Sequence, residues 1–141
     1  MNRCEMIRSA ESSIKRYKKL NILIDNGIRE MFFIRDMMKE YSDDHVNKRL
    51  KEQAAIEKAQ IDQCTIEKAE ILEAIDQIDS EAFQTLLKCI YIEEKSPVEV
   101  MGLTAKEVRE MKEEALLKYG KEIKDVKRAN SSGNTSRNKR K

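Results

Sequence analysis

Apolar residues between positions 12 and 41 recur every seven positions, in two series that lie three residues apart. The first series is Tyr17, Ile24, Met31 and Met38, and the second is Leu20, Gly27, Ile34 and Tyr41. This spacing is typical of a helix that packs lengthwise against another helix. Gly27 costs roughly 1 kcal/mol in a helix interior, or else it allows a partner helix to approach closely. The pattern therefore predicts a long helix over residues 12–41.

A second long helix is predicted from residue 44 or 45 to residue 78. The preceding turn contains Ser42, Asp43 and Asp44, which are favoured at helix starts. The apolar seam of this helix also includes two charged residues, Glu57 and Lys68. Its other members are Leu50, Ala54, Ile61, Cys64, Ile71, Ile75 and Ile78, and a separate stripe contains Ile56, Ala59 and Ile66. An antiparallel helical hairpin over residues 1–78 is the simplest arrangement, and an intermolecular coiled coil is the alternative.

Shorter helices are predicted after residue 78. Asp79 or Ser80 can cap a helix with a broad apolar stripe. That stripe is Phe83, Leu86, Leu87, Ile90 and Tyr91. Ser96, followed by Pro97 and then Glu99, predicts a new helix start. This helix reaches Gly102 after only about one and a half turns.

A last helix is predicted from Thr104, which can form a capping box with Glu107. Its apolar face consists of Val108, Met111, Ala115, Leu116 and Tyr119. Gly120 is a good stop signal for this helix. The chain ends in KRANSSGNTSRNKRK, which shows no apolar period, so we expect residues 121–141 to be a largely disordered tail.

The net positive charge of the chain lies at its C-terminal end. The whole chain carries +2, and residues 127–141 contain six Lys or Arg and no acid, so residues 1–126 carry −4. Such a tail can bind phosphates weakly, or it is simply a solvated end. The candidate phosphate contacts are Arg137, Lys139, Arg140 and Lys141.

The composition favours helices and argues against several other classes of protein. Charged residues make up 38% of the chain and aromatic residues 5%. We expect no membrane span and no signal peptide, and hence a cytoplasmic protein. The three cysteines (Cys4, Cys64 and Cys89) and His45 are too far apart to suggest a metal site. Without a phosphate-binding loop or a nucleophile motif, we expect no catalytic residue and no cofactor.

The stretch from Gly102 to Lys112 has the spacing of the turn and reading helix of a helix-turn-helix. Gly102 allows a left-handed backbone, and Leu103 can fill the core. Cations that point outward here can meet phosphates or guanine edges. The candidate DNA contacts are Thr104, Ala105, Lys106, Arg109 and Lys112. The alternative is a plain turn between two helices, with these cations paired to neighbouring glutamates.

The region from about Leu72 to Gly120 resembles the promoter-reading domain of sigma factors, and more closely the small phage transcriptional regulators of ArpU or RinA type. The resemblance is carried by LEAIDQIDSEAFQTLLKCIYIEEKSPVEV, GLT and KEVREMKEEALLKYG. It implies an all-α protein with an N-terminal helical hairpin over residues 1–78 and a sigma-like helix-turn-helix over residues 79–120. It also implies double-stranded DNA as a partner, RNA polymerase as a further candidate partner, and a homo-oligomer through the N-terminal helices.

Two features depart from that family pattern. Pro97 lies where an apolar helix residue belongs, and a proline inside a helix costs about 3 kcal/mol, so the first helix must restart at Ser96. Residues 79–119 contain nine acids and six bases, a net charge of −3, whereas DNA binding depends largely on phosphate neutralisation. The first hypothesis is therefore a phage or mobile-element transcriptional regulator. The second is a helical coiled-coil adaptor that binds protein and has no DNA role.

Overall fold

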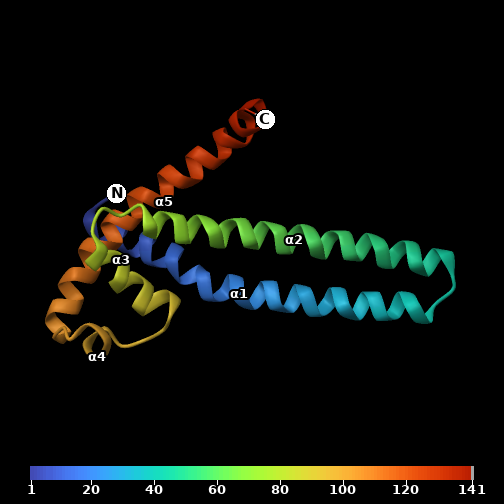
Figure 1. Cartoon of the computed structure of the whole chain (residues 1–141), viewed down its shortest axis with the longest axis horizontal. Helices are drawn as coiled ribbons and strands as arrows, with labels where there is room; N and C mark the ends of the chain where they lie inside the picture. The colour runs from blue at the N-terminus through green and yellow to red at the C-terminus, as the bar shows by residue number, and fades with distance from the viewer. Residues whose placement is uncertain (141) are drawn as a thin grey trace. The chain divides into compact units, whose positions relative to one another are not determined.

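The computed structural model of the chain is all-helical, as the sequence predicts (Figure 1). It describes the backbone of residues 1–140 and the side chains of residues 1–131, and no strand occurs in that part of the chain. The helices are α1 (Arg3–Glu40), α2 (Asp44–Asp76), α3 (Glu81–Leu87), the π-helix η1 (Lys88–Ile92), α4 (Pro97–Met101) and α5 (Ala105–Arg140). Among the described residues, no helix combines the length and the apolar character that a membrane crossing needs.

The chain divides into two compact units. We call Lys19–Lys68 the hairpin unit, and Met1–Lys18 together with Ala69–Lys141 the bundle unit. Each unit takes part of α1 and part of α2. The N-terminal part of α1 and the C-terminal part of α2 group with the helices that follow residue 78.

In the hairpin unit, α1 and α2 lie side by side in opposite directions (Figure 1). Leu20, Gly27 and Ile34 are buried at seven-residue intervals, as the predicted seam requires. Tyr41, the next member of that series, is 48% exposed because it follows the last residue of α1. Asp43 caps the N-terminus of α2, because its Oδ1 accepts the His45 N–H at 2.8 Å.

Gly27 is the residue of the seam that lies directly against α2. A Cβ atom at this position would be 2.7 Å from Ile61 Cγ1 and 3.1 Å from Ile61 Cδ1. Real Cβ atoms do not approach other carbon atoms so closely. Gly27 therefore lets α1 and α2 approach closely, and this packing offsets the unfavourable helix propensity of glycine.

The bundle unit contains the larger core. α3 packs against α5, and α4 contacts both α5 and η1. Buried apolar residues come from every helix of this unit except α4. They are Ala10, Ile14, Ile71, Ala74, Ile75, Ile78, Leu86, Leu87, Cys89, Tyr91, Ala115, Leu116, Tyr119, Ile123 and Val126.

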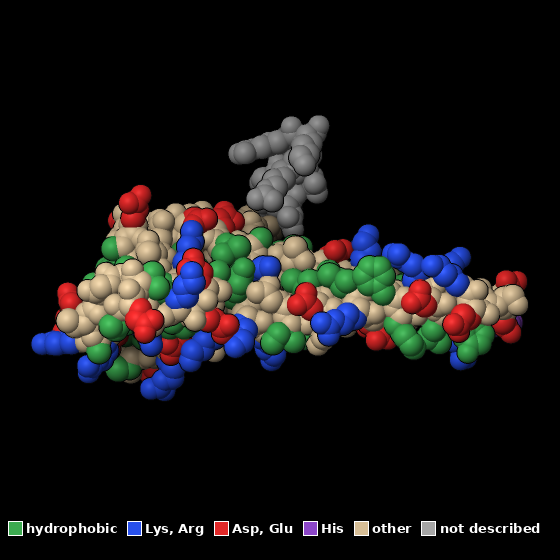
Figure 2. Space-filling model, turned by 60° about the horizontal axis from the view of Figure 1, so that its bottom comes forward, with side chains coloured by type: hydrophobic (Ala, Val, Ile, Leu, Met, Phe, Trp, Pro, Cys, Tyr) green, Lys and Arg blue, Asp and Glu red, His purple; other side chains and the backbone are tan. Residues whose placement is uncertain are grey.

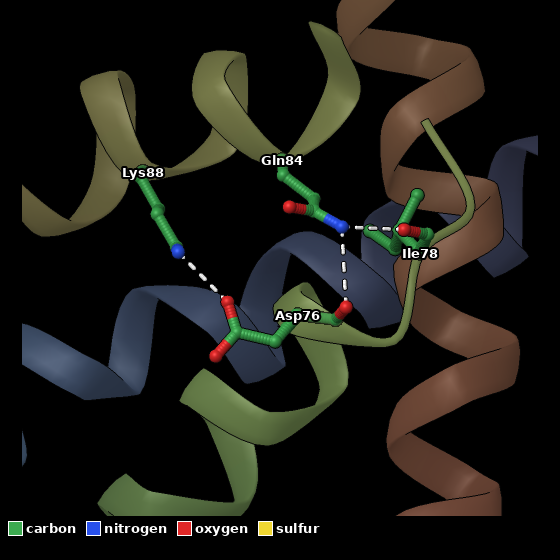
Figure 3. A network of polar contacts seen from close by, with 4 residues as sticks. All are labelled: Asp76, Ile78, Gln84 and Lys88. Carbon is green, nitrogen blue, oxygen red and sulfur yellow. Dashed lines mark hydrogen bonds and ion pairs between the residues drawn. The ribbon is translucent and has the colours of Figure 1, made fainter. Parts of the chain in front are cut away.

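Polar side chains fix the turn between α2 and α3 (Figure 3). Gln84 Nε2 donates to the carbonyl oxygens of Asp76, at 3.1 Å, and Ile78, at 2.6 Å. The Asp76 carbonyl belongs to the last residue of α2, and the Ile78 carbonyl lies two residues beyond it. Neither has a partner within the helix, so Gln84 acts as their cap. Lys88 Nζ lies 2.7 Å from Asp76 Oδ1 on the same turn. Ser80 caps α3, as predicted, by accepting the Phe83 N–H.

The predicted helix stop at Gly120 is wrong, because α5 continues through this residue to Arg140. A Cβ atom on Gly120 would lie 3.3 Å from Ala10 Cβ, so the glycine faces α1 closely. Ile123 and Val126 continue the apolar face of α5 and are buried. Their burial outweighs the roughly 1 kcal/mol that a glycine costs in a helix. The prediction of disorder from residue 121 is also wrong, because the first turns after Gly120 are helical and pack against the core.

Replacing Gly27 with Ala should destabilise the protein by roughly 1 kcal/mol. Overpacking against Ile61 costs about 1–3 kcal/mol, which exceeds the helix-propensity gain of about 1 kcal/mol. Chemical denaturation of the full chain measures the change, with Asp25→Ala, an exposed neighbour, as the control. In the double variant Gly27→Ala with Ile61→Ala, the clash is removed, so the loss should be smaller than the sum of the single losses by about 1 kcal/mol. Additive losses would contradict a close approach at Gly27.

Candidate nucleic-acid interface

The turn between α4 and α5 is fixed by its backbone and by reciprocal capping. Gly102 follows α4 with φ 68° and ψ 26°, a left-handed conformation that glycine adopts without steric cost. Thr104 Oγ1 accepts the Glu107 N–H at 3.1 Å, and Glu107 Oε1 accepts the Thr104 N–H at 3.0 Å. This is the predicted capping box. The bond from the Thr104 backbone also lowers the pKa of Glu107, because it favours the ionised carboxylate.

α4 itself is short and lightly packed. Pro97 occupies its first turn, and Ser96 precedes it in an extended conformation without a side-chain cap bond. The helix start at Ser96 is therefore as predicted, although the Ser96 side chain forms no hydrogen bond to the first turn of α4. Val98 and Val100 are 46% and 55% exposed, whereas Pro97 and Met101 are partly buried.

The first turns of α5 present two cations to solvent. Thr104, Ala105, Lys106 and Arg109 are exposed. Neither Lys106 nor Arg109 forms an ion pair with any side chain among residues 1–131. Two nearby acids are occupied elsewhere, since Glu107 caps the helix and Glu114 pairs with Arg3 at 2.7 Å. The corner between α4 and α5 therefore combines a rigid helix start with two uncompensated positive charges.

Lys112 differs from the other predicted contacts. Its Nζ lies 3.3 Å from Glu11 Oε2 on α1, and its side chain is 38% exposed. It precedes the buried Ala115 and Leu116 by three and four residues, so it stands on the side of α5 that faces the core. The charge of Lys112 is compensated within the protein, and we assign it a structural role.

Glu11 connects three helices of the bundle unit, and nothing in the sequence analysis pointed to it. The Tyr91 hydroxyl, from η1, donates to Glu11 Oε2 at 2.5 Å, and Lys112 of α5 approaches the same oxygen. The bond from Tyr91 lowers the pKa of Glu11, while burial raises the pKa of the Tyr91 hydroxyl. The sequence does contain one sign of this contact. Tyr91 ends an apolar stripe, and a buried tyrosine hydroxyl needs a hydrogen-bond partner.

Two further contacts connect α1 to the short helices. The Ser13 hydroxyl lies 3.0 Å from the Tyr119 hydroxyl, which belongs to a fully buried ring of α5. Lys18 Nζ lies 2.8 Å from Glu94 Oε1 in the connection before α4. The first contact joins α1 to α5 directly. Exposed ion pairs such as the second contribute little to stability.

The remaining predicted residues give no second site. The tail candidates Arg137, Lys139, Arg140 and Lys141 lie outside the described side chains. Within the described residues, no three His, Cys, Asp or Glu side chains cluster as metal ligands would. Cys89 is buried, Cys64 is half-buried and Cys4 is exposed.

No family model matches the chain, and no curated protein or solved structure matches it either. A functional proposal for this protein therefore depends on the chemistry of the corner between α4 and α5.

The stability of the protein should fall in acid as Glu11 becomes protonated. Its folded pKa lies below the unfolded value of about 4.3, so the unfolded chain takes up the proton first as the pH falls. The stabilisation is therefore present above pH about 4.3 and is lost as the pH falls through the folded pKa. Glu11→Gln should lower the free energy of unfolding at neutral pH by about 1–3 kcal/mol and flatten this decline.

Urea denaturation at a series of pH values measures both effects. Glu52→Gln, at an exposed position of α2, is the control and should keep the acid dependence of the unchanged protein. If Glu11→Gln and the unchanged protein lose stability with the same slope, the carboxylate of Glu11 does not have this role.

Proposed function

We propose that this protein is a sequence-specific DNA-binding transcriptional regulator of phage or mobile-element type, in which α4 and α5 act as a sigma-like helix-turn-helix. The observation that carries the proposal is the pair Lys106 and Arg109, exposed and unpaired within the described residues at the capped start of α5. Reading helices contact base edges with their N-terminal residues.

The side chains at this corner suit the floor of a major groove. Ala105 is small and exposed, so the backbone at the helix start can come close to DNA. Lys106 and Arg109 are three residues apart and project from neighbouring positions on the helix. An arginine can form two hydrogen bonds to guanine O6 and N7, while a lysine can bind guanine or phosphate.

The acidic residues of the same region limit how the protein can bind. Glu107 accepts the Thr104 N–H, and Glu114 pairs with Arg3. The Asp79 Oδ1 atom lies 3.5 Å from the Lys118 Nζ atom. Glu110 and Glu113 stay exposed near Arg109 and oppose the approach of phosphates. In this proposal, affinity therefore depends heavily on Lys106 and Arg109, and the basic C-terminal residues add non-specific attraction.

The double variant Lys106→Ala with Arg109→Ala should weaken specific binding by at least about 30-fold, because each contact is worth about 1–3 kcal/mol. Duplexes selected by the full chain from a random pool, followed by fluorescence anisotropy at several salt concentrations, provide the measurement. Removing two phosphate-neutralising charges should also reduce the slope of log affinity against log salt by about 2.

The matched control is Lys39→Ala with Lys48→Ala, which removes the same charge from exposed positions of the hairpin unit. This control should bind the selected duplex nearly as well as the unchanged chain. Equal losses in both double variants would reveal non-specific attraction only, and undiminished binding by the Lys106 and Arg109 variant would refute the proposed contacts.

A protein-binding adaptor without a DNA role is the second candidate, and exposed apolar residues of the hairpin unit favour it. The two candidates differ in the salt experiment. A DNA reader loses affinity steeply as salt increases, whereas an adaptor binds no duplex at any moderate salt concentration.

A further inference from the structure

Large apolar side chains remain exposed along the hairpin unit, where they are visible as hydrophobic patches on its surface (Figure 2). Their exposed fractions range from 40% to 59%. They are Ile22, Leu23, Ile28, Phe32 and Phe33 of α1 and Ile56 and Ile66 of α2. Isolated exposed apolar residues are ordinary in proteins, but contiguous apolar surface usually marks an interaction site.

Helical geometry divides the exposed residues of α1 between two flanks of the buried seam. Each residue turns the helix by about 100°, so Ile22 and Phe33, three turns apart, project in nearly the same direction. Ile28 and Phe32 project from the opposite flank. The ring of Phe32 already has a partner, because the Arg35 guanidinium lies 5.1 Å from its centroid. Phe33, at 59%, is the more exposed of the two phenylalanines.

One residue of α2 extends the flank that contains Phe33. The approach of Gly27 to Ile61 sets the antiparallel register and brings Ile56 level with Phe33. In two antiparallel helices, side chains rotated in the same sense from the seam lie on the same flank. Phe33 and Ile56 are rotated in the same sense and by similar amounts. We call Ile22, Leu23, Phe33 and Ile56 the Phe33 flank.

Between these apolar residues, the Phe33 flank has amide side chains and one acid, Glu30, at coiled-coil spacing. On α1 the series is Leu23, Asn26, Glu30, Phe33 and Met37, and on α2 it is Gln53, Ile56, Gln60 and Gln63. Steps of three and four residues are the spacing of a helical seam that packs against other helices. The sequence thus repeats, on this flank, the pattern that it uses to pack α1 on α2.

We propose that a second copy of this chain covers the Phe33 flank with its own Phe33 flank, so that two hairpin units form a four-helix bundle. The proposal requires no DNA and is independent of the function proposed above.

The charge of the hairpin unit favours another copy over a charged partner. Lys19–Lys68 contains nine bases and ten acids, a net charge of −1. Two copies therefore meet without strong repulsion, and a polyanion finds no complementary field. The amides Asn26, Gln53, Gln60 and Gln63 of the flank can exchange hydrogen bonds across a twofold interface, and Glu30 is the one charged residue in the two series.

The dimensions of the flank also suit a dimer. The part of α1 in the hairpin unit is about 33 Å long at 1.5 Å per residue, and two helices side by side are about 20 Å wide, which gives a face of roughly 700 Å². Specific, stable protein interfaces bury about 600–1,000 Å² on each partner. The face is large enough for a specific homodimer.

Sedimentation velocity of the full chain across micromolar concentrations tests the proposal. The unchanged chain should dimerise, and Phe33→Asp should raise the dissociation constant at least about 30-fold, as expected for a central apolar anchor. Phe32→Asp, the adjacent residue on the opposite flank, is the matched control and should dimerise normally. Circular dichroism verifies that each variant keeps its helices.

A second matched pair tests the same flank from α2. Ile56→Asp should weaken the dimer, and Ile66→Asp, at 51% exposure against 52% for Ile56, should not. A chain that stays monomeric throughout, a dimer that survives both Phe33→Asp and Ile56→Asp, or equal losses in the control variants would each overturn the proposal.

Discussion

The burial of one apolar stripe of α5 determines how the rest of the bundle unit can be arranged. Leu116, Tyr119 and Ile123 lie at helical spacing, and the Tyr119 side chain is completely buried. Gly120 lets Ala10 approach this helix, so α1 packs directly on the stripe. Apolar burial is worth about 25 cal/mol per Å², whereas exposed ion pairs usually contribute less than about 1 kcal/mol. The packed stripe sets the direction of α5, and the polar contacts of Glu11 adjust it.

The same packing gives the charges near α4 and α5 different roles. By composition alone, residues 79–119 are acidic and poorly suited to a polyanion. The structure separates these charges: Glu107 is used in a cap, Glu114 pairs with Arg3, and Lys112 pairs with Glu11. What remains exposed at the start of α5 is Lys106 and Arg109, which form no ion pair among the described residues, together with the acids Glu110 and Glu113. Net charge is therefore a poor guide to this surface, because it averages structural ion pairs with exposed groups.

The sequence predicted a structural feature correctly where neighbouring residues alone determine that feature. The capping box of Thr104, the left-handed Gly102 and the seven-residue burial in α1 follow from spacing alone. The errors arose where tertiary contacts decided the outcome. Gly120 reads as a helix stop until Ala10 is placed against it, and the bond between Glu11 and Tyr91 joins residues 80 positions apart. No local pattern distinguishes a glycine that ends a helix from one that admits a neighbouring helix.

The apolar residues of α1 are buried to different degrees in the two units. In Met1–Lys18, the large apolar residues of α1 are buried or partly buried, because the bundle unit surrounds them. After Lys19, the same helix keeps one buried seam and exposes Ile22 and Phe33 on a flank that α2 alone cannot cover. A two-helix layer buries only the surfaces that face each other. The exposed flank is the surface that the proposed second copy would cover, because α1 and α2 alone bury only the seam between them.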